Sequence, residues 1–390
     1  MEKMAFPLPD EPSIAVMPFE NLSGDPAQEY FSDGLTISII TGLYKIPNMF
    51  VIHRASSFAY KGKKVKVQQV AEDLGVRYVL EGSVQKAGDR IRLNVQLIDA
   101  VKGKHLWAES YDRELKDVFD VQDEITRKVV TEMAVKISWG EQARGWTRMT
   151  ESHEALDLYY EADKLFMRFE KESNLRAREL LTKAIELDPK FARAIAFLGW
   201  THMFDVDYGW AKDAAESFRQ AEELANRALA IDDTVYLAHA LMSQIYVRKE
   251  LYEQAIAASE RAVEAEPNNA TAIEGLALRM IFAGRPEEGL VLIRKAMRLT
   301  PHPPLYFLRV SVYANYFTGR YEEAITECEK FLKRQQHGAM ARILWQFLIT
   351  SYMELGREEE ARAEAQKLLE QHPDFSVEGY AKAIKRVPFK

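Results

Sequence analysis

Residues 270–301 read ATAIEGLALRMIFAGRPEEGLVLIRKAMRLTP and form one unit of a pattern that recurs through the second half of the chain. The unit holds a small residue, Gly289, twelve positions before a residue that stops the helix, Pro301. The same spacing recurs five more times, with small residues at Ala177, Ala221, Ala255, Ala324 and Ala361 and stops at Pro189, Asp233, Pro267, Gln336 and Pro373. A period of about 34 residues predicts a solenoid of six helical hairpins.

Two further features set the phase of these repeats. Glycines at 284, 319 and 356 lie 17 positions before their stops and precede the acidic helix starts RPEEG, RYEEA and REEEA. Glycine suits a left-handed turn that ends the first helix, and glutamate suits the start of the second. The second repeat carries about ten extra residues, FDVDYGWAKD at 204–213, which predict a protruding aromatic loop.

The first third of the chain has a different pattern. Strand-like runs occupy 13–19, 49–54, 77–85, 90–99 and 105–113, and helical runs occupy 25–45, 67–74 and about twenty residues from 117. Asp25 is expected to cap the first helix, with Pro26 at its first position. This order predicts an α/β domain in which the helices lie on one side of a mixed sheet.

The sequence therefore divides into two folding regions, an α/β amino-terminal domain and an all-α superhelix. We predict a leader at 1–12, the α/β domain at 13–138, a linker at 139–152, the six hairpins at 153–374 and a carboxy-terminal capping segment at 375–390.

Composition excludes several classes of function. The 390 residues carry a net charge of -7 and no basic stripe, so nucleic acid is a poor partner. The single cysteine rules out an internal disulfide, and no pair of histidines has the spacing of metal ligands. No apolar run is long enough for a membrane helix, and the start lacks a signal peptide. We expect no metal and no cofactor.

The α/β region resembles a known family. The blocks SIAVMPFENLSGDPAQEYFSDGLT, VIHRASSFAYKGK, VAEDLGVRYVLEGSV, GDRIRLNVQLIDAVKGKHLWAESYDREL and VFDVQDEIT are similar to the TolB-like amino-terminal domain of bacterial signalling proteins. The hairpins resemble tetratricopeptide repeats. In this family the pair of domains often follows a class III nucleotide cyclase domain or a winged-helix transcription regulator. The resemblance therefore implies a piece of a longer bacterial signalling protein.

Repeats of this type bind partners on the concave face, which the first helix of each hairpin lines. Counting back from the stop places Thr271, Glu274 and Leu278 of repeat four on that face, and counting from Gly199 places Arg193 and Trp200 of repeat two there. The candidates in repeat three are Leu237, Gln244 and Arg248. The two arginines suit a carboxylate or a backbone carbonyl of an extended peptide. The alternative is that these residues only pack against neighbouring helices. Repeat five is out of phase, so its groove residues stay unassigned.

We therefore predict a non-enzymatic interaction or regulatory module that binds a protein or peptide. Glu29, Asp33 and Glu81 are the carboxylates available for catalysis, with His53 or His105 as the base, but no motif links them. The alternative function is a small-ligand sensor with a pocket near 139–146, controlling a linked cyclase or transcription regulator. A homo-oligomer stays open. The extracytoplasmic side of a membrane-anchored parent is favoured over the cytoplasm, from family habit alone.

Overall fold

The computed structural model describes residues 4–133, 149–373 and 375–376. The chain separates into two compact units. Unit 1 comprises Met1–Ile245 with Arg261–Asn269, and unit 2 comprises Tyr246–Glu260 with Ala270–Lys390. The border between the units thus falls inside the repeats rather than between the sheet and the repeats. Most of the predicted linker and of the capping segment lies outside the described residues.

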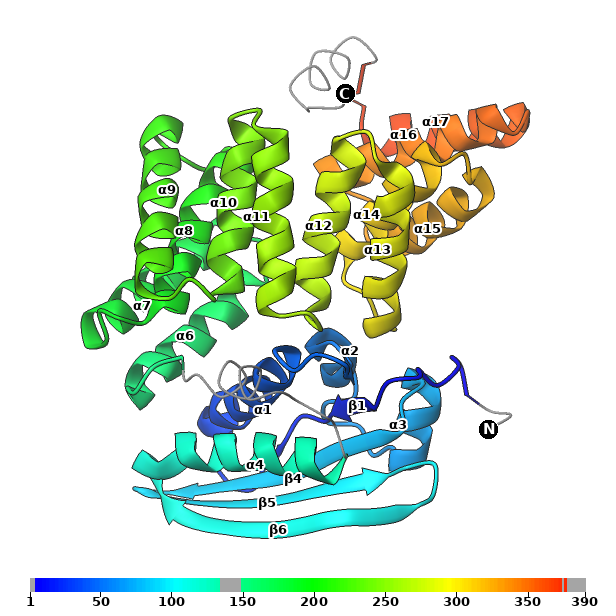
Figure 1. Ribbon diagram of the computed structural model, residues 1–390. Helices are drawn as coiled ribbons and strands as arrows, with labels where there is room; N and C mark the ends of the chain where they lie inside the picture. Colours follow the sequence, from blue (N-terminus) through cyan, green and yellow to red (C-terminus); the bar gives the residue numbers. More distant parts are fainter. Residues whose placement is uncertain (1–3, 134–148, 374, 377–390) are drawn as a thin grey trace. The chain divides into compact units, whose positions relative to one another are not determined.

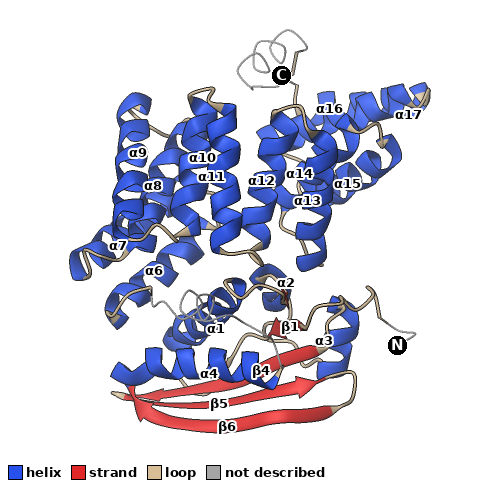
Figure 2. Ribbon diagram, in the orientation of Figure 1, coloured by secondary structure: helices blue, strands red, loops and turns tan. Residues whose placement is uncertain are grey.

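The amino-terminal part of unit 1 holds the strands and the helices that cover them (Figures 1 and 2). Its strands are β1 (Ser13–Val16), β2 (Glu20–Asn21), β3 (Phe50–Val51), β4 (Tyr78–Ala87), β5 (Arg90–Asp99) and β6 (Lys104–Glu114). Its helices are α1 (Glu29–Tyr44), α2 (Arg54–Phe58), α3 (Val67–Leu74) and α4 (Val118–Glu132), with single turns of 3-10 helix at Pro26–Gln28 and Leu115–Asp117.

The sheet is mixed, as the sequence predicts. Its strand order is β3-β1-β4-β5-β6, with β2 paired to β4. β1 runs parallel to β3 and β4, whereas β4, β5 and β6 form an antiparallel meander. A two-residue turn joins β4 to β5, and Gly88 takes a φ of 58° there, which glycine adopts without strain.

The helices cover both faces of the sheet, so the expectation that they lie on one side is wrong. Successive residues of a strand point to opposite faces. Ile14 and Val16 of β1 belong to the same core as α1 and α4, whereas Ala15 between them packs in a separate core with α3. The last core also contains Val79 of β4. Short helix α3 therefore closes the far face at one end of the sheet.

The boundaries of α1 also differ from the prediction. A turn of 3-10 helix comes first, and the α-helix starts at Glu29 rather than beside Asp25. The Gln28 backbone N–H donates to the Asp25 carbonyl, as in a tight turn, and the α-helix has no side-chain cap. The helix ends at Tyr44, close to the predicted position. Helix α2 and strand β2 were not predicted, because five and two residues carry too little periodicity.

Six helical hairpins follow in the described residues. Their pairs are α6 (His153–Phe166) with α7 (Lys171–Leu187), α8 (Ala192–Asp207) with α9 (Ala214–Ile231), α10 (Tyr236–Arg248) with α11 (Tyr252–Ala265), α12 (Ala270–Phe282) with α13 (Pro286–Leu299), α14 (Leu305–Phe317) with α15 (Tyr321–Arg334), and α16 (Ala339–Glu354) with α17 (Glu358–Gln371). All of these helices lie within 153–374, the span in which the sequence predicts the hairpins. Gly284, Gly319 and Gly356 take the left-handed φ that the sequence predicts between paired helices.

The recurring small residues lie where paired helices touch. Ala177, Ala221, Ala255, Ala324 and Ala361 are all between 0 and 2% exposed. A Cβ on Gly289 would lie 2.5 Å from Ile281 Cγ1 and 2.9 Å from the Ala277 carbonyl oxygen. Both distances are shorter than the van der Waals contacts that a Cβ atom makes. Close approach of the two helices therefore requires a small side chain at this position.

The insertion in repeat two does not form the predicted loop alone. Its first four residues extend α8 to Asp207, and only 208–213 form a connection. Tyr208 and Trp210 stack on each other with ring centroids 4.8 Å apart. Phe204 in turn contacts Tyr208 at 5.4 Å and Trp200 at 6.1 Å. The aromatic residues thus cover the end of α8 as one cluster.

Ala255→Trp tests the phase of the repeats. Ala255 is 1% exposed, so an indole has no room, and overpacking of this kind costs about 1–3 kcal/mol or more. We expect a lower midpoint in urea unfolding followed by circular dichroism. Ala257 lies on the same helix and is exposed, so Ala257→Trp is the matched control and should unfold like the wild type. Equal midpoints for the two variants would mean that the repeat phase is wrong.

Candidate protein-interaction site

The Arg193 side chain, on α8, makes hydrogen bonds and an ion pair with other residues of the same chain. Its Nη1 donates to Glu266 Oε1 at 2.8 Å and its Nε donates to the Tyr159 hydroxyl at 3.1 Å. The guanidinium also lies over the Tyr236 ring, 4.9 Å from its centroid. The two charged side chains are 12% and 1% exposed, and the pKa of Arg193 is raised by Glu266 although burial opposes it. In this structure Arg193 therefore serves a buried intrachain pair.

The other predicted residues of repeats two and three also contact their neighbours. Trp200 Nε1 donates to the Leu237 carbonyl at 3.0 Å, which joins α8 to α10. Gln244 Nε2 donates to Asp207 Oδ2 at 3.1 Å. Leu237 is half-buried, and Arg248 is exposed at the end of α10. The structure thus groups Arg193, Trp200 and Leu237 along one side of α8 and α10.

The α/β domain docks on the first repeats within unit 1. Arg54 at the start of α2 makes a bidentate pair with Asp163 of α6, at 2.5 and 3.0 Å. The Ser38 hydroxyl lies 2.5 Å from the Tyr160 hydroxyl. Gly34 of α1 lies under the Tyr160 ring, and a Cβ there would come within 2.6 Å of it. Helix α1 can approach α6 this closely only because Gly34 has no side chain.

The turn after α11 completes this junction. The Asn268 backbone N–H donates to the Tyr44 carbonyl at 3.2 Å, and Asn268 Nδ2 donates to the Ile46 carbonyl at 2.6 Å. Tyr44 is the last residue of α1 and Ile46 lies just beyond it, at the helix end, where carbonyl groups lack donors within the helix. Asn269 Nδ2 donates to Glu266 Oε2 at 2.7 Å, which holds the partner of Arg193 in place. Sequence reasoning missed this junction because its members are far apart along the chain.

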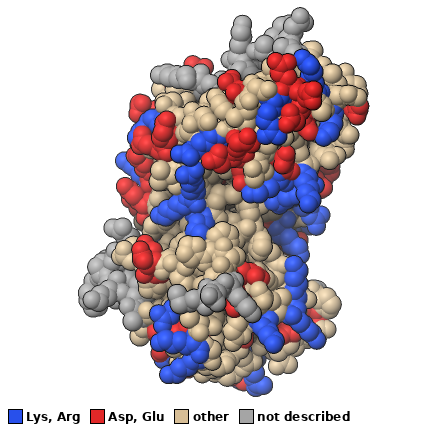
Figure 3. Space-filling model, turned by 90° about the vertical axis from the view of Figure 1, so that its right-hand side faces the viewer, with Lys and Arg blue, Asp and Glu red and all other residues tan. Residues whose placement is uncertain are grey.

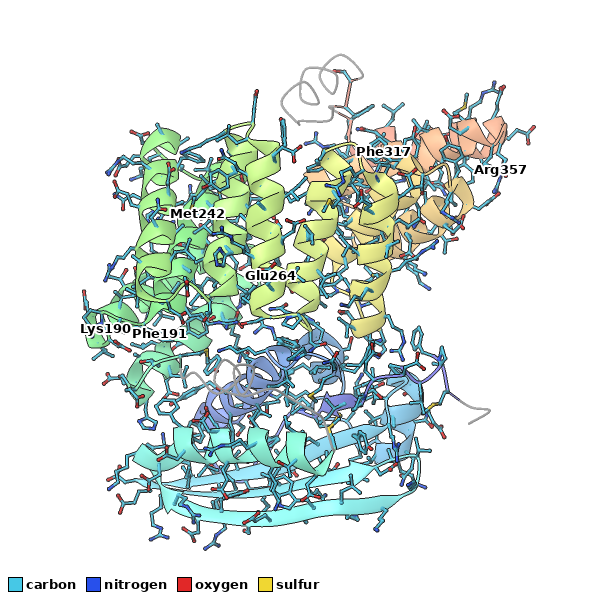
Figure 4. The ribbon with its side chains drawn as sticks, in the orientation of Figure 1. Lys190, Phe191, Met242, Glu264, Phe317 and Arg357 are labelled. Carbon is cyan, nitrogen blue, oxygen red and sulfur yellow. The ribbon has the colours of Figure 1, made fainter. Side chains whose placement is uncertain are left out.

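The turn between α7 and α8 belongs to the same packing. Lys190 and Phe191 lie side by side there (Figure 4). Phe191 is fully buried, with its ring centroid 5.3 Å from that of Tyr159, while the Lys190 side chain is exposed. The Tyr159 ring therefore packs against Phe191, and its hydroxyl accepts a hydrogen bond from the Arg193 guanidinium. Repeats one and two are held together by these groups.

The three predicted residues of repeat four share one face of α12 in unit 2. Thr271 Oγ1 lies 3.4 Å from the Tyr306 hydroxyl of α14. Leu278 is 8% exposed and Glu274 is 6% exposed. Burial raises the pKa of Glu274 to about 7, although Arg309 and Arg279 oppose the shift. The Glu274 Oε1 atom is buried and accepts no hydrogen bond from any residue that the structure describes. A buried carboxylate in this state is costly and marks the face as a candidate site.

The carboxylates considered for catalysis do not converge. Lys61 Nζ binds Asp33 at 2.5 Å and Glu29 at 2.8 Å, whereas Glu81 accepts from Gln96 on the open face of the sheet. Burial lowers the pKa of His53 to about 3, so this imidazole is neutral at physiological pH. In the described parts of the chain, no group of His, Cys, Asp and Glu side chains has the arrangement of a metal site.

The surface charge and the pockets lined by the described residues bear on the two candidate functions. Figure 3 shows acidic and basic groups interspersed on the face turned to the viewer. A cavity of about 40 Å³ lies between α1, α4 and α6, beside Ser38, Lys45 and Asp123. Metabolite pockets are roughly 300–1,000 Å³, so this cavity is too small. A second, more open pocket beside Met149, Ser152 and Lys190 measures about 460 Å³ and lies within that range. Residues 139–146, where the sensor pocket is expected, lie outside the described residues.

Similarity to known families supports this reading of the repeats. A family model described as a tetratricopeptide repeat matches residues 236–269, which hold α10 and α11. The hairpin of α10 and α11 is therefore similar to a tetratricopeptide repeat. A second model, described as the second domain of HilA/YgeH-like transcriptional regulators, matches residues 10–128. The α/β domain is therefore similar to the second domain of HilA/YgeH-like transcriptional regulators, while its likeness to TolB stays an expectation.

A curated relative is similar over part of its length. The chain is 46% identical over 232 residues to putative adenylate cyclase 3 of Rhizobium meliloti (strain 1021), covering 60% of this chain and 40% of the relative. It thus spans less than half of that protein.

Two solved structures also align. The first is pilF of Pseudomonas aeruginosa, at 19% identity and a TM-score of 0.43, over 60% of this chain and 98% of that one. The second is TolB of Acinetobacter baumannii, at 17% identity and a TM-score of 0.24, over 33% and 30%. Both TM-scores lie below 0.5, so the fold described above rests on the elements of this chain. Across the described ranges, no helix is both long and apolar enough to cross a bilayer.

Proposed function

We propose that this chain is a non-enzymatic interaction module of a bacterial signalling protein, and that repeats four to six bind a segment of a partner protein. The observation that carries the proposal is Glu274. It lies at a predicted groove position of α12, is 6% exposed and leaves one carboxylate oxygen without a hydrogen bond. The corresponding side of repeat two is occupied differently, since Arg193 is already paired with Glu266.

The parent protein is proposed from similarity alone. The matching relative is named a putative adenylate cyclase, and the matching α/β model comes from transcriptional regulators. A TolB-like domain followed by tetratricopeptide repeats would suit a regulatory part that reports partner binding to such a head. In that arrangement unit 2, which contains repeats four to six, supplies the binding surface.

Panning a random linear-peptide phage library on the immobilised chain tests this function. We expect enrichment of a shared peptide motif by the wild type and loss of that enrichment with Glu274→Lys. Lysine reverses the charge at the proposed surface. Absence of any enriched motif on the wild type would contradict peptide binding by these repeats.

Glu287→Lys is the matched control. Glu287 belongs to the same repeat, but it is exposed at the start of α13, away from the α12 face. The two variants carry the same change in net charge. Equal loss of enrichment in both would show a nonspecific charge effect and would count against the proposed surface.

A further inference from the structure

The groove position of Glu274 recurs with polar residues in the next two repeats. Glu274, Arg309 and Gln346 lie on α12, α14 and α16, each 27 positions before the stop of its own repeat, namely Pro301, Gln336 and Pro373. Repeat three has Ala240 at this position. The polar ladder, as we call Glu274, Arg309 and Gln346, is therefore confined to unit 2.

Adjacent members of the polar ladder lie on neighbouring helices. The Thr271 hydroxyl of α12 lies 3.4 Å from the Tyr306 hydroxyl of α14. Thr271 precedes Glu274 by three residues, and Tyr306 precedes Arg309 by three. Arg309 is close enough to lower the pKa of Glu274 electrostatically. The Tyr313 ring of α14 lies 4.9 Å from the Phe347 ring of α16, next to Gln346. The groove residues of repeat five are thus Tyr306 and Arg309, which the sequence left unassigned.

Each member of the polar ladder has one buried polar atom that makes no hydrogen bond within 4–133, 149–373 and 375–376, the described residues. These atoms are Glu274 Oε1, Arg309 Nε and Gln346 Oε1. Although Arg309 lowers the pKa of Glu274 electrostatically, the two side chains form no ion pair in the part of the chain that the structure describes. An unsatisfied buried polar atom costs about 1–3 kcal/mol. Three such atoms at one repeat position indicate a row of groups that a ligand would satisfy.

The chemistry of the three atoms selects the ligand. Glu274 and Gln346 present acceptors, and Arg309 between them presents a donor. A carboxylate would be attracted by Arg309 but repelled by Glu274, and an ammonium group would meet the opposite problem. A neutral amide carries both an N–H donor and a carbonyl acceptor, so it satisfies both without net charge.

We propose that the polar ladder binds an extended, uncharged peptide segment, whose amide N–H groups donate to Glu274 and Gln346 and whose carbonyl accepts from Arg309. This inference rests on the proposed function. Packed helices lie about 8–10 Å apart, so the three sites span roughly 16–20 Å. An extended chain rises about 3.3 Å per residue, so about five or six residues cross the polar ladder. Arg309 and Gln346 are half-buried, so part of each side chain faces solvent, although the Arg309 Nε and Gln346 Oε1 atoms themselves are buried.

The surroundings fit an extended peptide rather than a charged ligand. Phe317 ends α14 and is 41% exposed, with its ring 6.0 Å from Phe347 (Figure 4). Arg357, which directly precedes α17, is already paired with Glu360 at 2.8 Å and with Glu322 at 3.2 Å. An apolar side chain of the peptide thus has an aromatic neighbour, while this arginine is engaged by carboxylates of the chain.

The test uses peptides enriched by phage panning on the full chain, and measures their affinity by fluorescence anisotropy. We expect a run of about five or six uncharged residues, with at least tenfold weaker binding when Asp or Lys replaces the central one. Glu274→Leu, Arg309→Leu and Gln346→Leu should each weaken binding at least fivefold. Arg294→Leu, on the exposed side of α13, is the control and should bind like the wild type.

Stability separates a binding role from a folding role. Glu274→Leu removes a buried carboxylate that has no hydrogen-bond partner, so it should raise the unfolding midpoint while it weakens the peptide. Enriched peptides that bind all three variants normally, or that require a charged central residue, would overturn the polar ladder and leave the proposed function standing. No enriched peptide at all would overturn both.

Discussion

Arg193→Ala lowers the free energy of unfolding by about 3–5 kcal/mol, because it leaves Glu266 buried without its cation. Glu266 is 1% exposed and Arg193 is 12% exposed, so water cannot replace the lost contact. Tyr159 also loses the donor to its hydroxyl. Urea unfolding followed by circular dichroism measures the change, and the transition of unit 1 should move to lower urea.

Arg219→Ala is the control for this prediction. Arg219 pairs with Glu216 and Glu223 on the exposed side of α9, where such pairs add little stability. Its midpoint should stay near that of the wild type. Arg193→Leu combined with Glu266→Leu should recover part of the loss, although Asn269 then loses its acceptor. A small effect of Arg193→Ala, comparable to that of the control, would contradict a buried structural pair.

Glu274→Gln raises the free energy of unfolding at pH 8 by on the order of 3 kcal/mol. The carboxyl has an ordinary pKa of 4.5, and burial raises its pKa in the folded protein to about 7. The folded state therefore holds a proton that the unfolded state releases. This contribution to stability is complete below pH 4.5 and is lost as the pH rises through about 7. Because glutamine cannot ionise, the variant does not lose stability as the pH rises.

Urea unfolding of both proteins between pH 5 and 8 measures this difference. The gain from Glu274→Gln should be small near pH 5 and should grow with pH. Glu287→Gln, an exposed change on the same repeat, should follow the wild type at every pH. A gain that is the same at pH 5 and pH 8 would show that Glu274 does not titrate in this range.

Much of the fold follows from local patterns in the sequence. The repeat spacing places all six hairpins, and the small residues at 177, 221, 255, 289, 324 and 361 are buried as predicted. Strands β4, β5 and β6 follow from alternation of apolar and polar residues and from the turn at Gly88. These features depend on residues within one or two turns of each other, which is why they can be read without the structure.

The two faces of the sheet show where local pattern fails. Ile14, Ala15 and Val16 form one continuous apolar run, and such a run does not tell which helix covers which side. The tertiary structure places α3 against Ala15 and α1 against its neighbours. The extension of α8 through Asp207 was missed for a similar reason. The spaced aromatic residues Phe204, Tyr208 and Trp210 suit either a protruding loop or a continuation of α8 in which they pack beside Trp200.

For the candidate site, the sequence determined the periodic positions, among them Arg193 and Glu274, and only the tertiary structure decided their roles. Arg193 meets Glu266 from 73 residues away, while Glu274 meets no hydrogen-bond partner. The difference arises because repeat spacing fixes the side of a helix on which a residue lies. It does not fix which distant group of the folded chain arrives there, since that depends on long-range packing of the α/β domain and of successive repeats.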